Sequence, residues 1–493
     1  MLLGIDVGSS SVKLAVIEPD TGDVVASTQY PSDEMAIQSS QAGWAEQNPD
    51  DWYQNIKMGL KKISESISLQ SIKAIGITYQ MHGLVCVDKD QNVLRPSIIW
   101  CDSRAVEIGN KAFTEIGEEK CLQHLLNSPG NFTASKLKWV KENEPDIYNK
   151  IYKIMLPGDF IAMKLTGEIS TTVSGLSEGM LWDFKNERIP DFLMDYYGFS
   201  NEIIPEIKDT FSIQGEVNDN AAWDLGLAKG TPICYRAGDQ PNNAFSLNVL
   251  EPGEIAATAG TSGVVYGIAD KSEYDPKSRV NIFGHVNHSQ NTPRYGVLLC
   301  INGTGILNSW VKHNTCPNLS YDEMNNAAGK ISIGSDGLVV IPFGNGAERV
   351  IENQNPGCSV ANLNFNLHNN NHLLRATHEG IAFSFYYGMK IMNTENKINF
   401  KQIRAGKANM FLSPVFRQTL SNITQTPIEL YNTDGAIGAA RAAGYGNKTY
   451  SSFGEAFNSL KKLEIIEPEG NAKNSTENAY KNWETELKKI LNK

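Results

Sequence analysis

The sequence predicts an α/β fold, and two observations support that prediction. Short apolar runs typical of strands alternate along the 493-residue chain with stretches whose apolar residues recur at helical spacing. A small, hydroxyl-rich turn between two such strands occurs twice, at Gly8–Ser11 and again at Gly260–Gly263. The recurrence indicates two similar halves that each open with a hairpin, and therefore two domains facing each other across a cleft.

The first half begins with three expected strands. An apolar run at residues 2–5 carries Asp6 and ends at the first turn, a second run covers residues 12–17, and a turn at residues 20–23 precedes the third. A helix is expected from about Asp50, because apolar residues then recur every three or four positions. A further strand, residues 74–78, leads into a loop of sequence Gln80-Met81-His82-Gly83.

The second half repeats this order. Strand 254–258 precedes the second hydroxyl-rich turn, which places a boundary near residue 248. A Gly/Ala-rich run at residues 434–444 is expected to pack tightly as a helix, and a final helix covers about 475–491. The predicted division is therefore 1–247, 248–447, and a C-terminal helical tail at 448–493.

Composition excludes several classes of protein. The 44 Lys and Arg against 55 Asp and Glu give a net charge of −11, which disfavours nucleic acid and acidic membranes as partners. No stretch approaches the roughly 20 apolar residues of a membrane span, and the N-terminus lacks a signal-peptide pattern. Seven scattered cysteines without a CxxC pair indicate reduced thiols. We expect a soluble, cytoplasmic protein, with a homodimer as the default assembly.

The glycine-rich turns suit phosphate binding, because backbone N–H groups can reach phosphate oxygens there. Neither turn matches the GxxxxGK[ST] or GxGxxG pattern, which disfavours P-loop and Rossmann enzymes. Asp6 ends the first strand, and Asp239 follows strand 232–235 and opens a helix. One carboxylate could accept a proton from a bound hydroxyl and a second could hold magnesium, although each is by itself typical of a turn or a helix cap. His285 and His288 lack a third metal-ligand motif nearby, so a structural role is expected.

Specific sequence segments extend over most of the chain. The first half contains IDVGSSSVK, GWAEQNPDDW, QMHGLVCVDKDQNVLRPSIIWCDSRA and KLKWVKENEPDIYNKIYKIMLPGDFIAMKLTGE. The second contains AGDQPNNA, TAGTSGVV, FGHVNHSQNTPRYGVLLCINGTGILNSW and AGKANMFLSPVFRQTL. In this order they resemble the FGGY carbohydrate kinases, and specifically their xylulokinase branch.

The resemblance implies two actin-like, ribonuclease-H-like domains with the active site in the cleft between them, and a need for ATP and Mg²⁺. It implies that Asp239 is the general base and that Asp6 supports the metal, these two aspartates being the metal candidates. The first domain would bind the sugar and the second the nucleotide. The implied nucleotide-binding residues are Gly8, Ser9, Ser10, Ser11, Lys13, Gly260, Thr261, Ser262, Gly303, Thr304, Gly406, Lys407 and Asn409.

The resemblance also implies a substrate. Met81 and His82 match a motif that lines the sugar pocket of xylulokinases, so the expected reaction converts D-xylulose to D-xylulose 5-phosphate at its terminal hydroxyl. The further sugar-side candidates are Gly83, Trp100, Asp102, Arg104 and Gln240. The alternatives are a kinase for another ketose or a polyol (ribulose, fructose, an alditol) and a non-catalytic sugar or nucleotide sensor. Retention of Asp6 and Asp239 argues against a sensor.

Three segments depart from the family pattern. Ala405-Gly406-Lys407 stands where many relatives carry three glycines, so Lys407 could narrow the adenosine site or contact phosphate. Residues 346–350 read GAERV where xylulokinases commonly have Gly-Glu-Arg-Thr-Pro, and AGDQP replaces the usual Gly-Asp-Asn. These departures affect the predicted sugar and nucleotide preference more than the predicted kinase activity.

Overall fold

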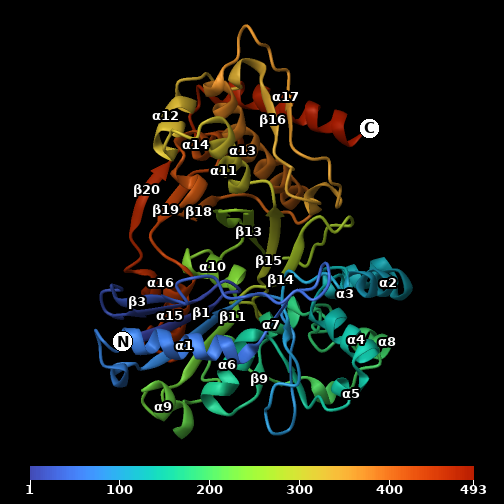
Figure 1. The fold of residues 1–493 in the computed structure, drawn as a ribbon, viewed down its shortest axis with the longest axis vertical. Helices are drawn as coiled ribbons and strands as arrows, with labels where there is room; N and C mark the ends of the chain where they lie inside the picture. Colours follow the sequence, from blue (N-terminus) through green and yellow to red (C-terminus); the bar gives the residue numbers. More distant parts are fainter. Residues whose placement is uncertain (493) are drawn as a thin grey trace. The chain divides into compact units, whose positions relative to one another are not determined.

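The computed structural model describes residues 1–492, which form two compact units (Figure 1). The first comprises residues 1–248, 283–295 and 433–460. The second comprises residues 249–282, 296–432 and 461–493, of which the last residue is not described. Both units are discontinuous in sequence, and the predicted division at residues 247 and 447 remains a prediction.

A five-stranded sheet forms the centre of the first unit. Its strand order is β11-β5-β1-β2-β3. β1 pairs antiparallel with β2 and parallel with β5, which in turn pairs parallel with β11, so three strands end at the same edge. The bounds are β1 (Leu2–Val7), β2 (Val12–Ile17), β3 (Val24–Tyr30), β5 (Ala74–Tyr79) and β11 (Ile233–Gly238), which confirm the predicted strands.

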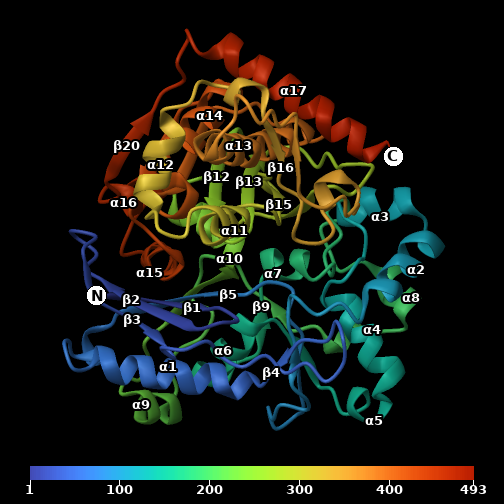
Figure 2. The same ribbon diagram turned by 45° about the horizontal axis from the view of Figure 1, so that its top comes forward.

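Helices cover both faces of this sheet, as Figure 2 shows. One face carries α1 (Pro49–Ile63) and α6 (Pro157–Thr166), and the other carries α10 (Asp239–Ser246) and α15 (Gly435–Gly446). The helical spacing of Trp52, Ile56 and Leu60 puts all three into the core against the sheet. The predicted helix from about Asp50 is thereby confirmed.

The Gly/Ala-rich helix α15 packs directly on the sheet backbone. A Cβ atom added to Gly4 on β1 would lie 1.7 Å from the carbonyl oxygen of Ala436, and one added to Gly76 on β5 would lie 2.0 Å from that of Ala439. Any side chain at either strand position would therefore push the helix away. Small residues on both surfaces explain the close approach, and the expected tight packing is confirmed.

The second unit contains a seven-stranded sheet of order β14-β15-β13-β12-β18-β19-β20. β12 pairs antiparallel with β13 and parallel with β18, and β18 pairs parallel with β19. The order β13-β12-β18-β19 thus repeats β2-β1-β5-β11, as the two similar turns predict. The strands are β12 (Glu254–Ala259), β13 (Gly263–Ala269), β14 (Asn281–Gly284), β15 (Tyr295–Ile301), β18 (Gln402–Gly406), β19 (Ile428–Tyr431) and β20 (Lys462–Ile466).

Further elements complete each unit. The second has α11 (Gly305–Thr315), α12 (Tyr321–Gly329), α13 (Asn370–Thr394), α14 (Pro414–Thr424) and α17 (Lys473–Leu491), with the hairpin of β16 (Val339–Ile341) and β17 (Ser359–Ala361). The first has α2 (Val106–Ile116), α3 (Glu118–Leu125), α4 (Thr133–Asn143), α5 (Pro145–Tyr148), α7 (Val173–Glu178), α8 (Asp191–Tyr197), α9 (Asp219–Leu225) and α16 (Phe453–Phe457). Its short strand pairs are β4 (Glu46–Gln47) with β7 (Ser97–Ile98), β6 (Val85–Val87) with β8 (Lys153–Met155), and β9 (Ser170–Thr171) with β10 (Glu206–Ile207).

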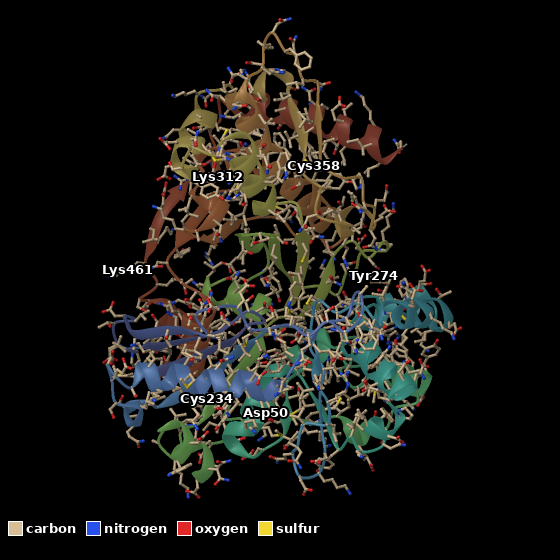
Figure 3. All side chains as sticks on the ribbon, viewed as in Figure 1. Asp50, Cys234, Tyr274, Lys312, Cys358 and Lys461 are labelled. Carbon is tan, nitrogen blue, oxygen red and sulfur yellow. The ribbon has the colours of Figure 1, made fainter. Side chains whose placement is uncertain are left out.

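The structure tests two expectations from composition, namely reduced cysteines and the absence of a membrane span; Figure 3 draws the side chains. All seven cysteines are free thiols, as expected; Cys234, labelled in the figure, is buried and Cys358 is exposed. Among residues 1–492, no helix combines the length and apolar character that crossing a membrane requires.

Candidate active site

Asp6 and Asp239 lie at the shared edge where the parallel strands of the first unit end. Asp6 is the penultimate residue of β1, and Asp239 directly follows β11 as the first residue of α10. Burial raises the pKa of Asp6 to about 7, and the negative charges of Asp239 and Asp434 add to that shift against the opposing charge of Lys13. Burial also raises the pKa of Asp239 to about 6, although hydrogen bonds from Gln240 lower it. The structure thus places two carboxylates with raised pKa values close enough for their charges to interact.

The N-terminus of α15 lies beside Asp6. A Cβ atom on Gly435 would come within 2.5 Å of the Asp6 Oδ2 atom, so only glycine leaves room for that carboxylate. Asn242 donates from Nδ2 to the Gly435 carbonyl over 2.9 Å, and Asp434 caps the helix by accepting from the N–H of Ile437. Sequence reasoning assigned none of these three residues to the site. The Asp-Gly pair that starts the Gly/Ala-rich helix was the available signal.

The first hydroxyl-rich turn closes with a hydrogen bond from the Gly8 N–H to the Ser11 carbonyl, 3.0 Å long. Trp100, half of whose surface is exposed, donates from Nε1 to the Ser9 Oγ atom over 3.3 Å. Ser11 is buried and Lys13 is exposed. This hydrogen bond therefore connects the turn, which contains predicted phosphate-binding residues, to Trp100, which is a predicted sugar-binding residue.

The sugar-loop residue His82 is held by hydrogen bonds at its backbone and its ring. Its φ angle is 62°, which a side-chain-bearing residue rarely adopts without support. Its N–H donates to Glu178 Oε2 over 3.0 Å, and its Nδ1 lies 2.9 Å from the Glu178 carbonyl oxygen. Because that carbonyl can only accept, Nδ1 carries a proton. The ring packs against Phe132 and Phe283, with centroids 4.8 and 5.4 Å away.

Glu178, the last residue of α7, connects the Met81–His82 loop to the end of β11, where Asp239 follows. Burial raises the pKa of Glu178 well above its usual range, against hydrogen bonds from His82 and Tyr79 that lower it. A Cβ atom on Gly238 would lie 3.1 Å from Glu178 Oε1 and 2.5 Å from Met81 Cγ. Met81 is buried there against Gly238, the residue directly before Asp239. Met81, His82, Glu178 and Asp239 therefore form one cluster, and sequence reasoning missed Glu178.

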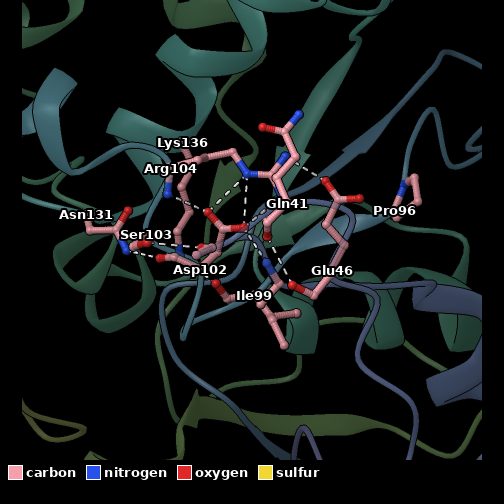
Figure 4. A network of polar contacts seen from close by, with 12 residues as sticks. Gln41, Glu46, Pro96, Ile99, Asp102, Ser103, Arg104, Asn131 and Lys136 are labelled. Carbon is pink, nitrogen blue, oxygen red and sulfur yellow. Dashed lines mark hydrogen bonds and ion pairs between the residues drawn. The ribbon is translucent and has the colours of Figure 1, made fainter. Parts of the chain in front are cut away.

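A second buried group, Lys136 on α4, holds the other side of the same loop, and Figure 4 labels it near Asp102 and Ile99. Its Nζ donates to the carbonyl oxygens of His82, over 2.8 Å, and of Ile99, over 2.9 Å. Burial lowers the pKa of Lys136 to about 7, while the nearby Asp102 carboxylate raises it. The amine thus joins the sugar loop to the segment that precedes Trp100.

The side chains of Asp102 and Arg104 bond to each other and do not face solvent. Arg104 donates to both Asp102 oxygens and pairs with Glu46 over 2.7 Å (Figure 4). Its guanidinium lies 3.8 Å from the ring centroid of Trp44. Both side chains are almost fully buried. They support the segment around Trp100 from inside the protein. Of the remaining candidates, Gly83 faces Pro157, whereas Gln240 is half-buried beside Asp239.

The second unit contains a cavity of about 430 Å³ beside the second hydroxyl-rich turn. The N-terminus of α11 is bonded to that turn, because the N–H groups of Gly305 and Ile306 donate to the carbonyls of Gly260 and Thr261 over 2.9 and 3.1 Å. The predicted residues that line the cavity are Gly260, Thr261 and Asn409. The lining residues that sequence reasoning missed are Ala259, Gly305, Ile306, Asn308, Ser309, Tyr321, Asp322, Asn325, Met410, Leu412 and Ser413.

Other predicted nucleotide residues lie outside this lining. Lys407 pairs with Glu464 over 3.1 Å, and neither it nor Gly406, Ser262, Gly303 or Thr304 is among the lining residues. Glu348, which belongs to the departing GAERV segment, accepts the N–H groups of Asn302 and Gly303, each over 3.0 Å. This buried carboxylate fixes the loop before α11. The altered segment therefore has a structural function in this chain.

Comparison with known proteins identifies the family. The model of the FGGY family of carbohydrate kinases matches with its N-terminal domain over residues 1–246 and with its C-terminal domain over residues 255–446. The xylulose kinase of Bacillus subtilis is 29% identical over 92% of this chain and 90% of its own length. The xylulose kinase of Escherichia coli is 28% identical over 90% and 89%.

Solved structures share the fold at lower identity. The xylulose kinase from Rhodospirillum rubrum superposes with a TM-score of 0.88, at 22% identity and complete coverage of both chains. The gluconate kinase from Lactobacillus acidophilus and the Plasmodium falciparum glycerol kinase with ADP both reach 0.89, at 20% and 22% identity, each with 99% of this chain and 98% of theirs covered. The two matched domain models span most of the chain, which therefore belongs to the FGGY family of carbohydrate kinases.

Proposed function

We propose that this kinase transfers the γ-phosphoryl group of ATP to the terminal hydroxyl of a ketose, D-xylulose, and that Asp239 is the general base. The observation that carries the proposal is the cluster in which Met81 packs against Gly238, the residue before Asp239, while the buried Glu178 bonds the His82 N–H and is close enough to Asp239 to feel its charge. A carboxylate whose pKa is raised to about 6 is a stronger base than an exposed one and is still mostly ionised at neutral pH.

The reaction balances without a further reactant. The sugar oxygen forms a bond to the γ-phosphorus while the bond between that phosphorus and the bridging β-oxygen breaks, and ADP leaves. The proton of the hydroxyl passes to the Asp239 carboxylate. Gln240, which bonds that carboxylate, keeps it oriented.

The cavity of the second unit is the proposed adenosine site. Its volume suits a nucleoside, since ligand pockets of this kind measure about 300–1,000 Å³. The turn at Gly260–Ser262 borders it and would hold phosphate oxygens through backbone N–H groups, as would Gly8–Ser11 in the first unit. A side chain of Lys407 bonded to Glu464 is compatible with this assignment.

The residues of the first unit fit Mg²⁺ brought in by ATP. Among residues 1–492, no cluster of three or more acidic, His or Cys side chains could enclose a metal on its own. Mg²⁺ commonly uses one or two carboxylates and completes its shell with waters and substrate phosphates. Asp6, whose pKa is raised by neighbouring negative charge, offers such a carboxylate, and we propose that it holds the ion. When bound, the ion neutralises negative charge on the phosphates.

D-Xylulose is the favoured sugar because the curated relatives that match over most of the chain are named xylulose kinases. The fold itself does not select the sugar, since gluconate and glycerol kinases superpose equally well. The sugar loop provides the chemical basis: His82 can bond a hydroxyl group and Met81 covers an apolar edge.

A substrate panel with coupled detection of ADP tests the proposal. D-Xylulose, D-ribulose, D-fructose, gluconate, glycerol and an alditol are compared at equal concentration, with ATP and Mg²⁺ in excess. We expect the highest kcat/KM for D-xylulose. Preference for another sugar would keep the kinase assignment and replace the substrate, whereas no sugar-dependent ADP release would favour a non-catalytic sensor.

A further inference from the structure

The wall of the 430 Å³ cavity is supported from behind by a buried histidine. His378, on α13, is fully buried. Its Nε2 atom lies 3.1 Å from Oδ1 of Asn308 on α11, and its Nδ1 atom lies 3.0 Å from Oγ of Ser413, the N-cap of α14. Asn308 and Ser413 both line the cavity, whereas His378 does not. One ring therefore joins two cavity-lining helices.

The chemistry of these groups determines the direction of each hydrogen bond. Oδ1 of an amide can only accept, so Nε2 of His378 carries the proton and donates to Asn308. Burial, with a contribution from the Arg375 charge, lowers the pKa of His378 to about 4, so the ring is neutral and Nδ1 accepts. The Ser413 hydroxyl donates to Nδ1, and its oxygen accepts the Phe416 N–H over 3.3 Å as the helix cap. The chain of bonds has one consistent orientation.

This orientation fixes the amide of Asn308. Because Oδ1 is bonded to His378, the NH₂ group is the end of the side chain that a ligand can meet. The Asn308 side chain could otherwise present either an acceptor or a donor to the cavity, since the two ends of an amide have nearly the same shape. The structure places Oδ1 against His378, and a neutral ring whose Nδ1 accepts from Ser413 presents its Nε2–H to that oxygen.

We infer that His378 is a positioning residue for the nucleotide: it holds the Asn308 NH₂ group toward the cavity as a hydrogen-bond donor. The ligand atom selected there is an acceptor of the nucleoside, either a purine ring nitrogen or a ribose oxygen. The inference rests on the proposed nucleotide site and adds the residue that sets its hydrogen-bond pattern.

Two amide substitutions form a matched pair. In His378→Gln the longer side chain still places an N–H near Asn308, whereas in His378→Asn the shorter one reaches only the Ser413 side. Binding of ADP to the full-length protein is measured by titration calorimetry without sugar. We expect near wild-type affinity for H378Q and about tenfold weaker binding for H378N, the loss of roughly one neutral hydrogen bond. Equal affinities of the two variants would overturn the inference.

A double-mutant cycle separates positioning from a general loss of packing. Asn308→Ala removes the donor itself, so H378N in the N308A background should cause no further loss of ADP affinity. An undiminished tenfold loss in that background would show that His378 acts independently of Asn308 and would also overturn the inference. Asn308→Asp, which keeps an acceptor toward His378 and replaces the donor with an oxygen, should weaken ADP binding at least as much as N308A.

Nucleotide analogues distinguish the two sources of the acceptor. If a ring nitrogen is the acceptor, the deaza-ADP that lacks this nitrogen should bind wild type weakly, and N308A should not weaken its binding further. If a ribose oxygen is the acceptor, 2′-deoxy-ADP or 3′-deoxy-ADP should show the same two effects. All analogues retaining full sensitivity to N308A would contradict the inference. Because sugar is absent throughout, failure of the xylulose assignment leaves these results unaffected, whereas failure of wild type to bind ADP would refute the nucleotide site itself.

Discussion

The ammonium group of Lys136 donates a hydrogen bond to the carbonyl oxygen of His82, 2.8 Å away. Glu178 accepts the N–H group of the same residue over 3.0 Å, so two buried ionisable side chains hold one peptide of the sugar loop from opposite ends. This support explains how His82 keeps a φ angle of 62°. In the proposed sugar site, a loop with a fixed backbone would discriminate between hydroxyl positions.

The first prediction concerns Lys136 and pH. Its pKa is about 7 in the folded protein and 10.5 in an unfolded chain, so between these values the unfolded chain binds the proton that the folded protein has released. Stability from this residue should therefore rise with pH from 7 toward 10. In thermal unfolding at pH 7, 8 and 9, the Tm of wild type should rise relative to the Tm of Lys136→Met as the pH increases. Parallel curves would contradict the shifted pKa; Lys61→Met, at an exposed position, is the control for the substitution itself.

The second prediction uses Glu178, whose raised pKa favours the neutral form. Glu178→Gln should keep kcat/KM for the sugar within about threefold, because the neutral amide retains an acceptor for the His82 N–H. Glu178→Ala should raise the sugar KM about tenfold, since an unsatisfied buried N–H costs about 1–3 kcal/mol. Steady-state kinetics of both variants provide the test. A Gln variant as impaired as the Ala variant would mean that the charged form is required.

The third prediction addresses the base. Asp239→Asn should lower kcat by at least about 100-fold while sugar affinity is largely retained, because the amide cannot accept the hydroxyl proton. Asp219→Asn is the matched control, since Asp219 is likewise the first residue of its helix but is exposed. Near-normal kcat in D239N would remove the catalytic assignment.

The fourth prediction separates the effect of Asp6 on turnover from its effect on the stability of the protein. Asp6→Asn should impair Mg²⁺-dependent turnover more than sugar binding, and titration of Mg²⁺ against kcat checks this. Burial and the charge of Asp239 raise the pKa of Asp6, so the folded wild type loses stability as the pH rises from 4 to 7. Asp6→Asn removes this carboxylate, and the variant should therefore have a higher Tm than wild type at pH 7. An unchanged Mg²⁺ dependence with normal kcat would assign Asp6 a purely structural role.

The fifth prediction tests the sugar. D-Xylulose should have a clearly higher kcat/KM than its C3 epimer D-ribulose, because a wrong hydroxyl leaves buried polar groups unpaired. His82→Ala should reduce that preference by about 1–3 kcal/mol. The measurement compares kcat/KM for both sugars in wild type and variant. A wild type that prefers ribulose would refute the xylulose assignment and leave the kinase assignment intact.

Much of the fold follows from local patterns. Apolar runs bounded by turn residues predict β1, β2 and β5 closely, and they place Asp6 and Asp239 at strand ends. Glu178, Lys136 and His378 escaped prediction because a charged or titratable residue becomes buried only through tertiary contacts, which leave no periodic signal. The structure groups residues 433–460 with the first unit, and their small residues indicate close packing without indicating the partner.

The contact of α15 with Gly4 and Gly76 has a consequence for the order of folding. The strands β1 and β5 emerge from the ribosome early, whereas the helix that covers them is made more than 350 residues after β5. Until then, that face of the first sheet has only α10 to cover it, and the carboxylate of Asp6 lacks the neighbouring helix N-terminus. The nascent chain therefore carries an exposed apolar surface through most of its synthesis, which is the situation in which chaperones bind. Completion of the catalytic edge is thereby delayed until almost the whole polypeptide has been made.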